Sequence, residues 1–231
     1  MKSKITIGIT DCSKFGNYEK WIQEEGADVI KLSYQYNNFE DIKKCDGIIL
    51  SGGEDVHPRF YKKNNYLEYC YEIDEKRDDF EWKVLEHTEQ LQLPLLGICR
   101  GLQVANVYFG GTLIPDIPSF GKFNHARYER TDRHHVIHVD PNSDLKKIVG
   151  LESGEINSAH HQSADLVGKD LVANAISPDG IIEGLERKNK EGKPYLMLVQ
   201  WHPERMIDQQ SVFSKNIRRS FLEAAKKGTT N

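Results

Sequence analysis

The sequence lacks long apolar runs and an excess of either charge, and each absence removes a class of function. Its 231 residues carry 31 Lys and Arg against 35 Asp and Glu, a formal net charge of −4. Nucleic-acid-binding domains usually show a basic patch or stripe, which this balance does not support. No apolar stretch approaches the roughly 18 residues of a membrane span, and the apolar run before Asp11 is too short for a signal-peptide core. We therefore expect a cytoplasmic protein that binds neither nucleic acid nor a membrane.

Cysteines are also few, and their spacing excludes a disulfide framework or a cysteine metal site. The four cysteines are spread over the chain without close pairs: Cys12, Cys45, Cys70 and Cys99. In a reducing compartment they are most simply free thiols. Three of them are expected to pack in the interior or lie at the surface, whereas the neighbours of Cys99 set it apart.

Short apolar segments bounded by turn residues recur in the first half of the chain, at 5–10, 28–34, 47–52 and 94–99. Nearly continuous apolar segments suit buried strands of a parallel sheet. Helical patterns lie between them, at 17–26, 74–92 and 99–111. The second of these has an acidic first turn, and one face carries Phe80, Val84, Leu85 and Leu91. This alternation of strands and helices predicts βαβ units with right-handed crossovers.

The second half of the chain has a different pattern. Apolar segments follow one another with short turns, as in an antiparallel region, at 134–140, 171–177, 180–186 and 195–201. A final helix is expected at about 208–227. We therefore predict one domain over residues 1–231, built on a mixed sheet.

Cys99 ends a predicted buried strand, with Gly97 and Gly101 two residues to either side and a helical pattern directly after it. This is the arrangement of a nucleophile elbow, with Cys in place of Ser. The glycines leave room for a sharp turn and for close contact between helix and strand. The side chain would project from the carboxyl edge of the sheet, at a helix N-terminus that favours a thiolate. A buried structural cysteine with glycine neighbours is the alternative interpretation.

A nucleophilic thiol needs a base and a group that orients the base. His202 and Glu204 follow directly on the apolar segment 195–201, and Pro203 between them fixes φ and has no N–H. In an extended chain residues i and i+2 point to the same side, so Glu204 can reach one imidazole nitrogen while the other faces Cys99. A histidine after a strand is often only a surface or capping residue. Together with the elbow, however, it predicts a Cys–His–Glu triad.

These segments resemble the class I glutamine amidotransferase-like hydrolases, in particular the γ-glutamyl-γ-aminobutyrate hydrolase branch, peptidase family C26. The resemblance extends from about Ile5 to the C-terminal helix and rests on six blocks in the expected order: DGIILSGGEDVHPRFY, RDDFEWKVL, PLLGICRGLQVANVYFGGTLIPDI, INSAHHQS, ANAISPDGIIEGLE and LVQWHPE. It implies an α/β flavodoxin-like three-layer sandwich, with a central, mostly parallel sheet and an antiparallel extension.

The resemblance also implies the catalytic residues. Cys99 would be the nucleophile, His202 its base and Glu204 the orienting carboxylate. The oxyanion hole would consist of the backbone N–H groups of Gly53 and Arg100. The physical reading agrees, because a Gly-Gly loop after a buried strand lets backbone N–H groups approach a substrate closely, and the N–H after the nucleophile points to where an oxyanion forms.

Four further residues match the family's substrate side. Gln103, four residues after the nucleophile, matches the position that helps to hold the glutamyl head group. Asn157, Ser158 and His160 match a substrate-side loop.

The reaction implied is cleavage of a γ-glutamyl amide through a thioester on Cys99, without a cofactor. The substrate would be γ-glutamyl-γ-aminobutyrate or a related small γ-glutamyl compound. The sequence does not indicate which amine is released. The alternative is a glutaminase subunit that delivers ammonia to a separate synthetase, and a role in binding alone is a third reading. A homodimer also stays open.

Histidines crowd one stretch of the chain, which raises the question of a metal. Six of the nine lie between residues 125 and 161: His125, His134, His135, His138, His160 and His161. His134 and His138 have the i, i+4 spacing of helical ligands, but their segment alternates like a strand, which keeps them apart. No cysteine or paired carboxylate joins them. We therefore expect no metal.

Three residues lie near the Gly-Gly loop in the sequence without an assigned role. Arg77 is expected to pair with other charges at the surface. For Arg59 and Tyr61, contact with substrate and pairing at the surface both stay open.

Overall fold

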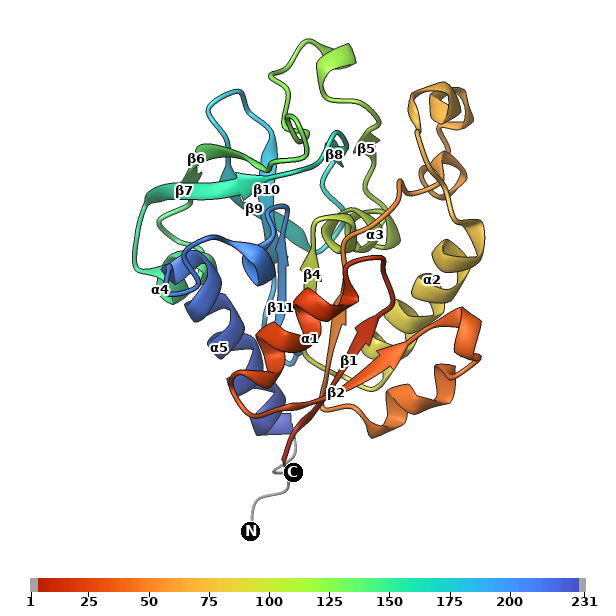
Figure 1. Ribbon diagram of the computed structural model, residues 1–231, viewed down its shortest axis with the longest axis vertical. Coiled ribbons are helices and arrows are strands. Elements are labelled where there is room, and N and C mark those ends of the chain that lie inside the picture. The colour runs from red at the N-terminus through yellow and green to blue at the C-terminus, as the bar shows by residue number, and fades with distance from the viewer. Residues whose placement is uncertain (1–3, 229–231) are drawn as a thin grey trace.

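The computed structural model describes residues 4–228, and a nine-stranded sheet runs through its centre (Figure 1). The strands lie in the order β2 (Asp28–Leu32), β1 (Thr6–Thr10), β3 (Gly47–Leu50), β4 (Leu95–Ile98), β11 (Leu196–Val199), β10 (Ile182–Arg187), β9 (Leu171–Ile176), β6 (Arg133–Val139) and β7 (Ser153–Ser158). A two-stranded sheet pairs β5 (Leu113–Ile114) with β8 (Ser163–Ala164).

The sheet has a parallel half and an antiparallel half. Strands β2, β1, β3, β4 and β11 pair in parallel, whereas β11, β10, β9, β6 and β7 pair antiparallel. Every residue of β3, β4 and β11 is buried, which explains their uniformly apolar sequences. The predicted mostly parallel sheet with an antiparallel extension is confirmed.

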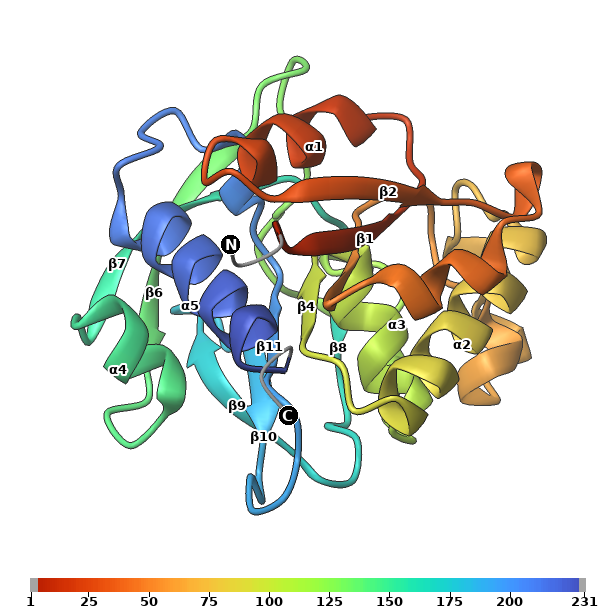
Figure 2. The ribbon, with the colours of Figure 1, turned by 90° about the horizontal axis from the view of Figure 1, so that it is seen from below.

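Helices cover both faces of the parallel half and make three layers (Figure 2). Helices α1 (Phe15–Gln23) and α5 (Val212–Gly228) lie on one face, with α4 (Asp144–Val149) packed beside α5. Helices α2 (Glu75–Gln90) and α3 (Arg100–Tyr108) cover the other face. Two buried apolar clusters fill the spaces between the layers. The predicted flavodoxin-like sandwich is confirmed. No helix within residues 4–228 is long and apolar enough to cross a membrane.

Helix α2 begins where its sequence indicates. The carboxylate of Asp74 caps it by accepting hydrogen bonds from the N–H groups of Lys76 and Arg77, and acidic residues fill the first turn. Its apolar face is buried as expected at Phe80, Val84 and Leu85. Leu91 was wrongly placed on that face, because the helix ends at Gln90 and leaves Leu91 44% exposed.

Two elements of the structure were not predicted from the sequence pattern. Helix α4 is only six residues long and is fixed by its ends, where Ser143 caps the Lys146 N–H and Gly150 adopts a positive φ of 75°. Strand β7 includes Asn157 and Ser158. The loop expected at these two residues is therefore wrong, since the loop begins only after Ser158.

Candidate active site

Cys99 occupies a strained turn between β4 and α3. Its φ of +53° and ψ of −107° are values that a residue with a side chain rarely adopts. The flanking glycines are required by close packing: a Cβ on Gly97 would lie 2.6 Å from Leu198 Cδ2, and one on Gly101 would lie 2.2 Å from the Leu50 carbonyl oxygen. The turn therefore has the geometry of a nucleophile elbow.

His202 and Glu204 stand beside this turn. Imidazole Nδ1 of His202 lies 2.9 Å from Glu204 Oε1, and both side chains are at least nine-tenths buried. His202 directly precedes a short 3₁₀ turn, Pro203–Arg205, that contains Glu204, so the extended segment expected from the sequence is replaced by a turn. Because the carboxylate accepts a hydrogen from Nδ1, Nε2 is the nitrogen left to interact with the nearby Cys99 side chain.

The surroundings of His202 favour its protonated form. Burial lowers the pKa of the imidazole, but the charge of Glu204 and then the interaction with Cys99 outweigh burial and hold the pKa well above its ordinary value. The arrangement therefore places a protonated imidazole beside the Cys99 side chain.

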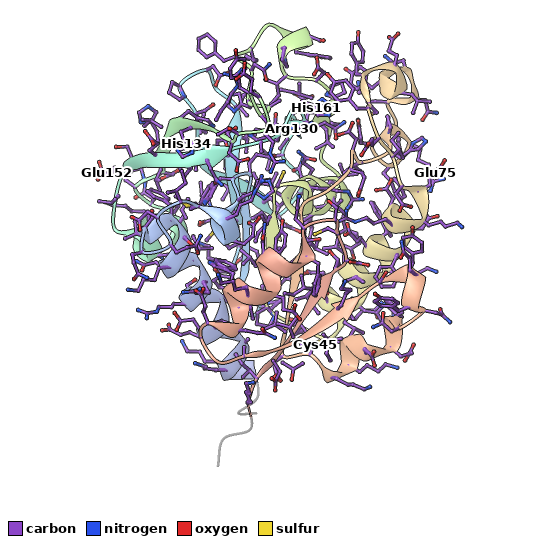
Figure 3. All side chains as sticks on the ribbon, viewed as in Figure 1. Cys45, Glu75, Arg130, His134, Glu152 and His161 are labelled. Carbon is purple, nitrogen blue, oxygen red and sulfur yellow. The ribbon has the colours of Figure 1, made fainter. Side chains whose placement is uncertain are left out.

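The other described cysteines lack this environment. Burial raises the pKa of Cys45 to about 12 and that of Cys70 to about 11, so both are neutral thiols near pH 7. All four cysteines are free, as predicted. Figure 3 places Cys45 near the lower end of the molecule, at the start of β3 and away from the carboxyl ends of the parallel strands.

The loop after β3 packs against the same two side chains. A Cβ on Gly52 would lie 3.0 Å from His202 Cε1 and 3.7 Å from Cys99 Cβ. The Gly52 N–H donates to the Tyr18 hydroxyl at 2.9 Å, which leaves Gly53 as the loop glycine to offer an N–H. The structure thus brings the Gly52–Gly53 loop, the elbow and the imidazole together.

Arg77 holds this loop, and the prediction that it pairs at the surface is wrong. It is 5% exposed and donates to the Gly52 carbonyl at 2.9 Å and to Ser51 Oγ at 3.1 Å. Its other nitrogens pair with Glu54 at 2.5 Å and with Glu81 at 3.0 Å. A helical signal was present, because Arg77 lies three and seven residues before the buried Phe80 and Val84 on the same face of α2.

Glu81 connects this arrangement to the elbow. Its carboxylate is fully buried and pairs with both Arg77 and Arg100, and Arg100 also pairs with Asp78. Arg100 carries one predicted oxyanion-hole N–H, and Arg77 braces the loop that carries the other. Helix α2 therefore positions both halves of the predicted hole.

The two residues left open by the sequence differ in burial. Arg59 is partly exposed and pairs with Glu75 and Asp79, at 2.7 Å and 2.9 Å. Tyr61 is 5% exposed, and its hydroxyl has no hydrogen-bond partner among residues 4–228.

Gln103 lies on helix α3 directly after Cys99, and Asn157 contacts His202. The side-chain amide of Gln103 donates to the Gln162 carbonyl at 2.9 Å. Asn157 hydrogen-bonds both the N–H and the carbonyl of His202. Its contacts are those of a residue that positions the imidazole, and the substrate roles of both residues stay predictions.

Ser158 and His160 border a cluster of histidines. Ser158 Oγ donates to the His125 carbonyl at 2.8 Å, and the His160 ring lies beside that of His125. His125, His135 and His160 surround the carboxylate of Glu183. The crowding of histidines between residues 125 and 161 was a signal for this cluster, but nothing in the sequence placed Glu183 beside them, because the members come from four separate segments.

The remaining histidines of this stretch stand apart. His134 lies on β6 and pairs with Glu155 at 3.3 Å, and His138 is exposed on the same strand. His161 lies between Asp55 and Asp116. Figure 3 shows His134 toward the β7 side of the molecule and His161 near its upper end.

Comparison with known proteins places this site in a family. The family model for peptidase C26 matches residues 11–204. The chain is 40% identical over 167 residues to a Schizosaccharomyces pombe protein named "Putative glutamine amidotransferase", covering 71% of this chain and 64% of that protein. It is 30% identical over 180 residues to gamma-glutamyl-gamma-aminobutyrate hydrolase PuuD of Escherichia coli K12, covering 71% of this chain and 65% of that protein.

Solved structures share the fold at low sequence identity. A glutamine amidotransferase of Thermotoga maritima matches with a TM-score of 0.63 and 12% identity, covering 98% of this chain and 86% of that chain. At this identity the likeness concerns the fold alone.

Proposed function

This chain belongs to the peptidase C26 family, a group of glutamine amidotransferase-like hydrolases, and on that premise we propose that it is a cysteine-dependent γ-glutamyl hydrolase. One observation carries the proposal: a cysteine on a strained strand-to-helix turn faces an imidazole whose other nitrogen is held by a buried carboxylate. Cys99 is then the nucleophile, His202 the acid and base, and Glu204 the residue that orients and charges the imidazole.

The reaction proceeds by acyl transfer. The Cys99 thiolate attacks the γ-carbonyl carbon, a C–S bond forms, and the N–H groups of Gly53 and Arg100 hold the oxyanion. Imidazolium His202 gives its proton to the amine nitrogen as the C–N bond breaks. Neutral His202 then takes a proton from water, whose hydroxide adds to the thioester. When the C–S bond breaks, glutamate leaves and the thiolate–imidazolium pair is restored.

We propose a small γ-glutamyl amide as the substrate. Support comes from the similarity to gamma-glutamyl-gamma-aminobutyrate hydrolase. The four free thiols suit the reducing cytoplasm in which we propose that the chain acts. Gln103 lies one helical turn after Cys99 and suits contact with the glutamyl head group.

The test is a panel of γ-glutamyl-γ-aminobutyrate, γ-glutamyl peptides and glutamine, assayed with wild type, Cys99→Ala and Cys45→Ala. We expect kcat/KM to vanish for Cys99→Ala and to persist for Cys45→Ala, and mass spectrometry to find the glutamyl adduct on Cys99. Full activity of Cys99→Ala would contradict the proposal.

The second candidate is a glutaminase subunit, favoured by relatives named as glutamine amidotransferases. A stand-alone hydrolase cleaves γ-glutamyl amides without a partner. A subunit prefers glutamine and is nearly silent until a synthetase is bound. The same panel, run on the purified chain alone, separates the two.

A further inference from the structure

Three histidines and one glutamate converge in the antiparallel half of the molecule. His125 precedes β6, His135 lies on β6, His160 follows β7, and Glu183 lies on β10. One ligand atom from each lies within 4.8 Å of all the others. His125 and His160 are 4% and 5% exposed, and Glu183 is fully buried. Four segments far apart in the chain therefore aim nitrogen and oxygen atoms at one point.

Three of the six separations between these atoms are close to those of a tetrahedral metal site. Glu183 Oε1 lies 3.1 Å from His125 Nδ1, 3.3 Å from His135 Nε2 and 3.6 Å from His160 Nε2. A tetrahedron with zinc–ligand bonds of about 2.0–2.1 Å has edges of about 3.3–3.4 Å. The three measured separations bracket this edge length.

The outer nitrogen of each imidazole fixes which nitrogen faces the centre. His160 Nδ1 donates to the Gln162 carbonyl at 2.9 Å, and His135 Nδ1 donates to the Val136 carbonyl at 3.1 Å. His125 Nε2 lies 3.3 Å from the Asp179 carboxylate. Carbonyl and carboxylate oxygens only accept, so the outer nitrogens carry the hydrogens and the inner nitrogens present lone pairs. Metal-bound histidines have this second shell of acceptors.

The inner atoms also lack partners. The three inner nitrogens and both oxygens of Glu183 have no hydrogen-bond partner among residues 4–228. Leaving buried polar atoms unpaired is costly, and such a group calls for an explanation. A cation between the three nitrogens and the carboxylate would satisfy all of these atoms.

We propose that His125, His135, His160 and Glu183 bind one zinc ion. Three imidazole nitrogens and one carboxylate oxygen in a tetrahedron suit Zn²⁺, whereas Mg²⁺ and Ca²⁺ prefer all-oxygen sites. Four protein ligands fill the coordination sphere and leave no open position for a substrate, so the site is structural. The sequence-based expectation of no metal weighed six histidines that include these three, but it found helical ligand spacing only at His134 and His138 and no carboxylate to join them.

The site fastens the antiparallel half to the catalytic centre. The carbonyl of Glu183 accepts the N–H of Gln200 at 2.8 Å, two residues before His202. The Gln162 carbonyl that holds His160 also accepts from Gln103, on the nucleophile helix. A pocket of about 510 Å³ is lined by His125 and His135 and gives the metal a route to the site.

Metal content provides the first test and does not depend on activity. We would purify the chain without an affinity tag in the Cys99→Ala background, so that the thiol beside His202 offers no second zinc site. Elemental analysis should find one zinc per chain. After chelation, Co²⁺ should bind at one equivalent and give the intense visible absorption of a tetrahedral site. Zinc in 100-fold excess over its Kd should raise Tm by roughly 5–10 °C.

Two histidines on the same strand supply the variant and its control. His135→Ala should lose the metal and the zinc-dependent rise in Tm. His134→Ala, which alters an exposed neighbour paired with Glu155, should keep both. If the metal-free chain binds neither Zn²⁺ nor Co²⁺ and zinc leaves its Tm unchanged, the proposal is wrong, whether or not the chain hydrolyses γ-glutamyl amides.

Discussion

The side chain of Asn157 holds the backbone of His202 at two points: Nδ2 donates to the His202 carbonyl and Oδ1 accepts the His202 N–H, both at 3.1 Å. Asn157 lies on β7, the edge strand, and three strands separate β7 from β11 in the sheet. This contact therefore joins the far edge of the antiparallel half directly to the proposed base.

These two hydrogen bonds predict that replacing Asn157 changes kcat more than KM. In Asn157→Ala the imidazole loses its fixed position, and a misplacement of about 1 Å costs about 10²-fold in rate. We expect kcat for γ-glutamyl amide hydrolysis to fall by about that factor while KM changes little. Asn142→Ala, at an exposed turn, should match wild type. A rise in KM at unchanged kcat would instead support the substrate-binding role expected from the sequence.

Replacing Glu204 should move the pH dependence of the reaction. Its charge is the main influence that raises the pKa of His202, so the imidazolium persists below that raised pKa and is lost as the pH rises through it. In Glu204→Gln the pKa falls toward its ordinary value, about 6.5. The basic limb of kcat/KM should move to lower pH, and kcat should fall by about 10².

An exposed glutamate serves as the control for this shift. Glu155→Gln removes a charge that pairs only with His134 in the described structure, so its pH profile should overlay that of wild type. An unmoved basic limb in Glu204→Gln would mean that the limb reports a group other than His202.

Much of the fold and the turn at Cys99 could be predicted, because both depend on local patterns. Buried strands have nearly continuous apolar sequences, and the turn at Cys99 requires glycines at a fixed spacing. Arg77 was missed because a charged residue in the first turn of a helix usually faces water, and its burial depends on Glu54 and Glu81.

The group of three histidines and Glu183 could not be predicted from the sequence for a different reason. His125, His135, His160 and Glu183 share no regular spacing, and the pairing of strands in the antiparallel half brings them together. Tertiary proximity of this kind leaves no periodic trace in one sequence.

Gly53→Ala should impair the oxyanion hole without removing the nucleophile. A Cβ at this residue would lie 1.9 Å from Arg77 Nη1, and its φ of +157° disfavours a side chain. Arg77 cannot retreat without breaking its bonds to Ser51 and Gly52. Since losing one donor of such a hole costs about 10²–10³ in kcat, we expect a fall of that size.

Alkylation separates this effect from damage to the thiol. The rate at which iodoacetamide alkylates Cys99 should stay near the wild-type value in Gly53→Ala. Gly16→Ala on α1 is the matched control, because its Cβ would meet nothing within 4 Å and its backbone is helical. Unchanged kcat in Gly53→Ala would contradict the prediction, because it would mean that the loop keeps its position with a Cβ at this residue.

Glu81→Gln should lower stability in a pH-dependent way. Burial raises the pKa of Glu81, but the charges of Arg100 and then Arg77 outweigh it and keep the pKa below its ordinary range. A carboxyl group with a depressed pKa stabilises the fold above its unfolded pKa of about 4.3, and this contribution is lost as the pH falls through the folded value. Removing one member of a buried ion network costs about 3–5 kcal/mol. Urea denaturation should show that loss in the free energy of unfolding near pH 7, and the difference from wild type should shrink in acid.

Glu86→Gln is the control, because Glu86 is exposed on the same helix and its loss should change the free energy of unfolding little at any pH. A difference between Glu81→Gln and wild type that stays constant down to acid pH would mean that Glu81 acts through packing and not through its charge.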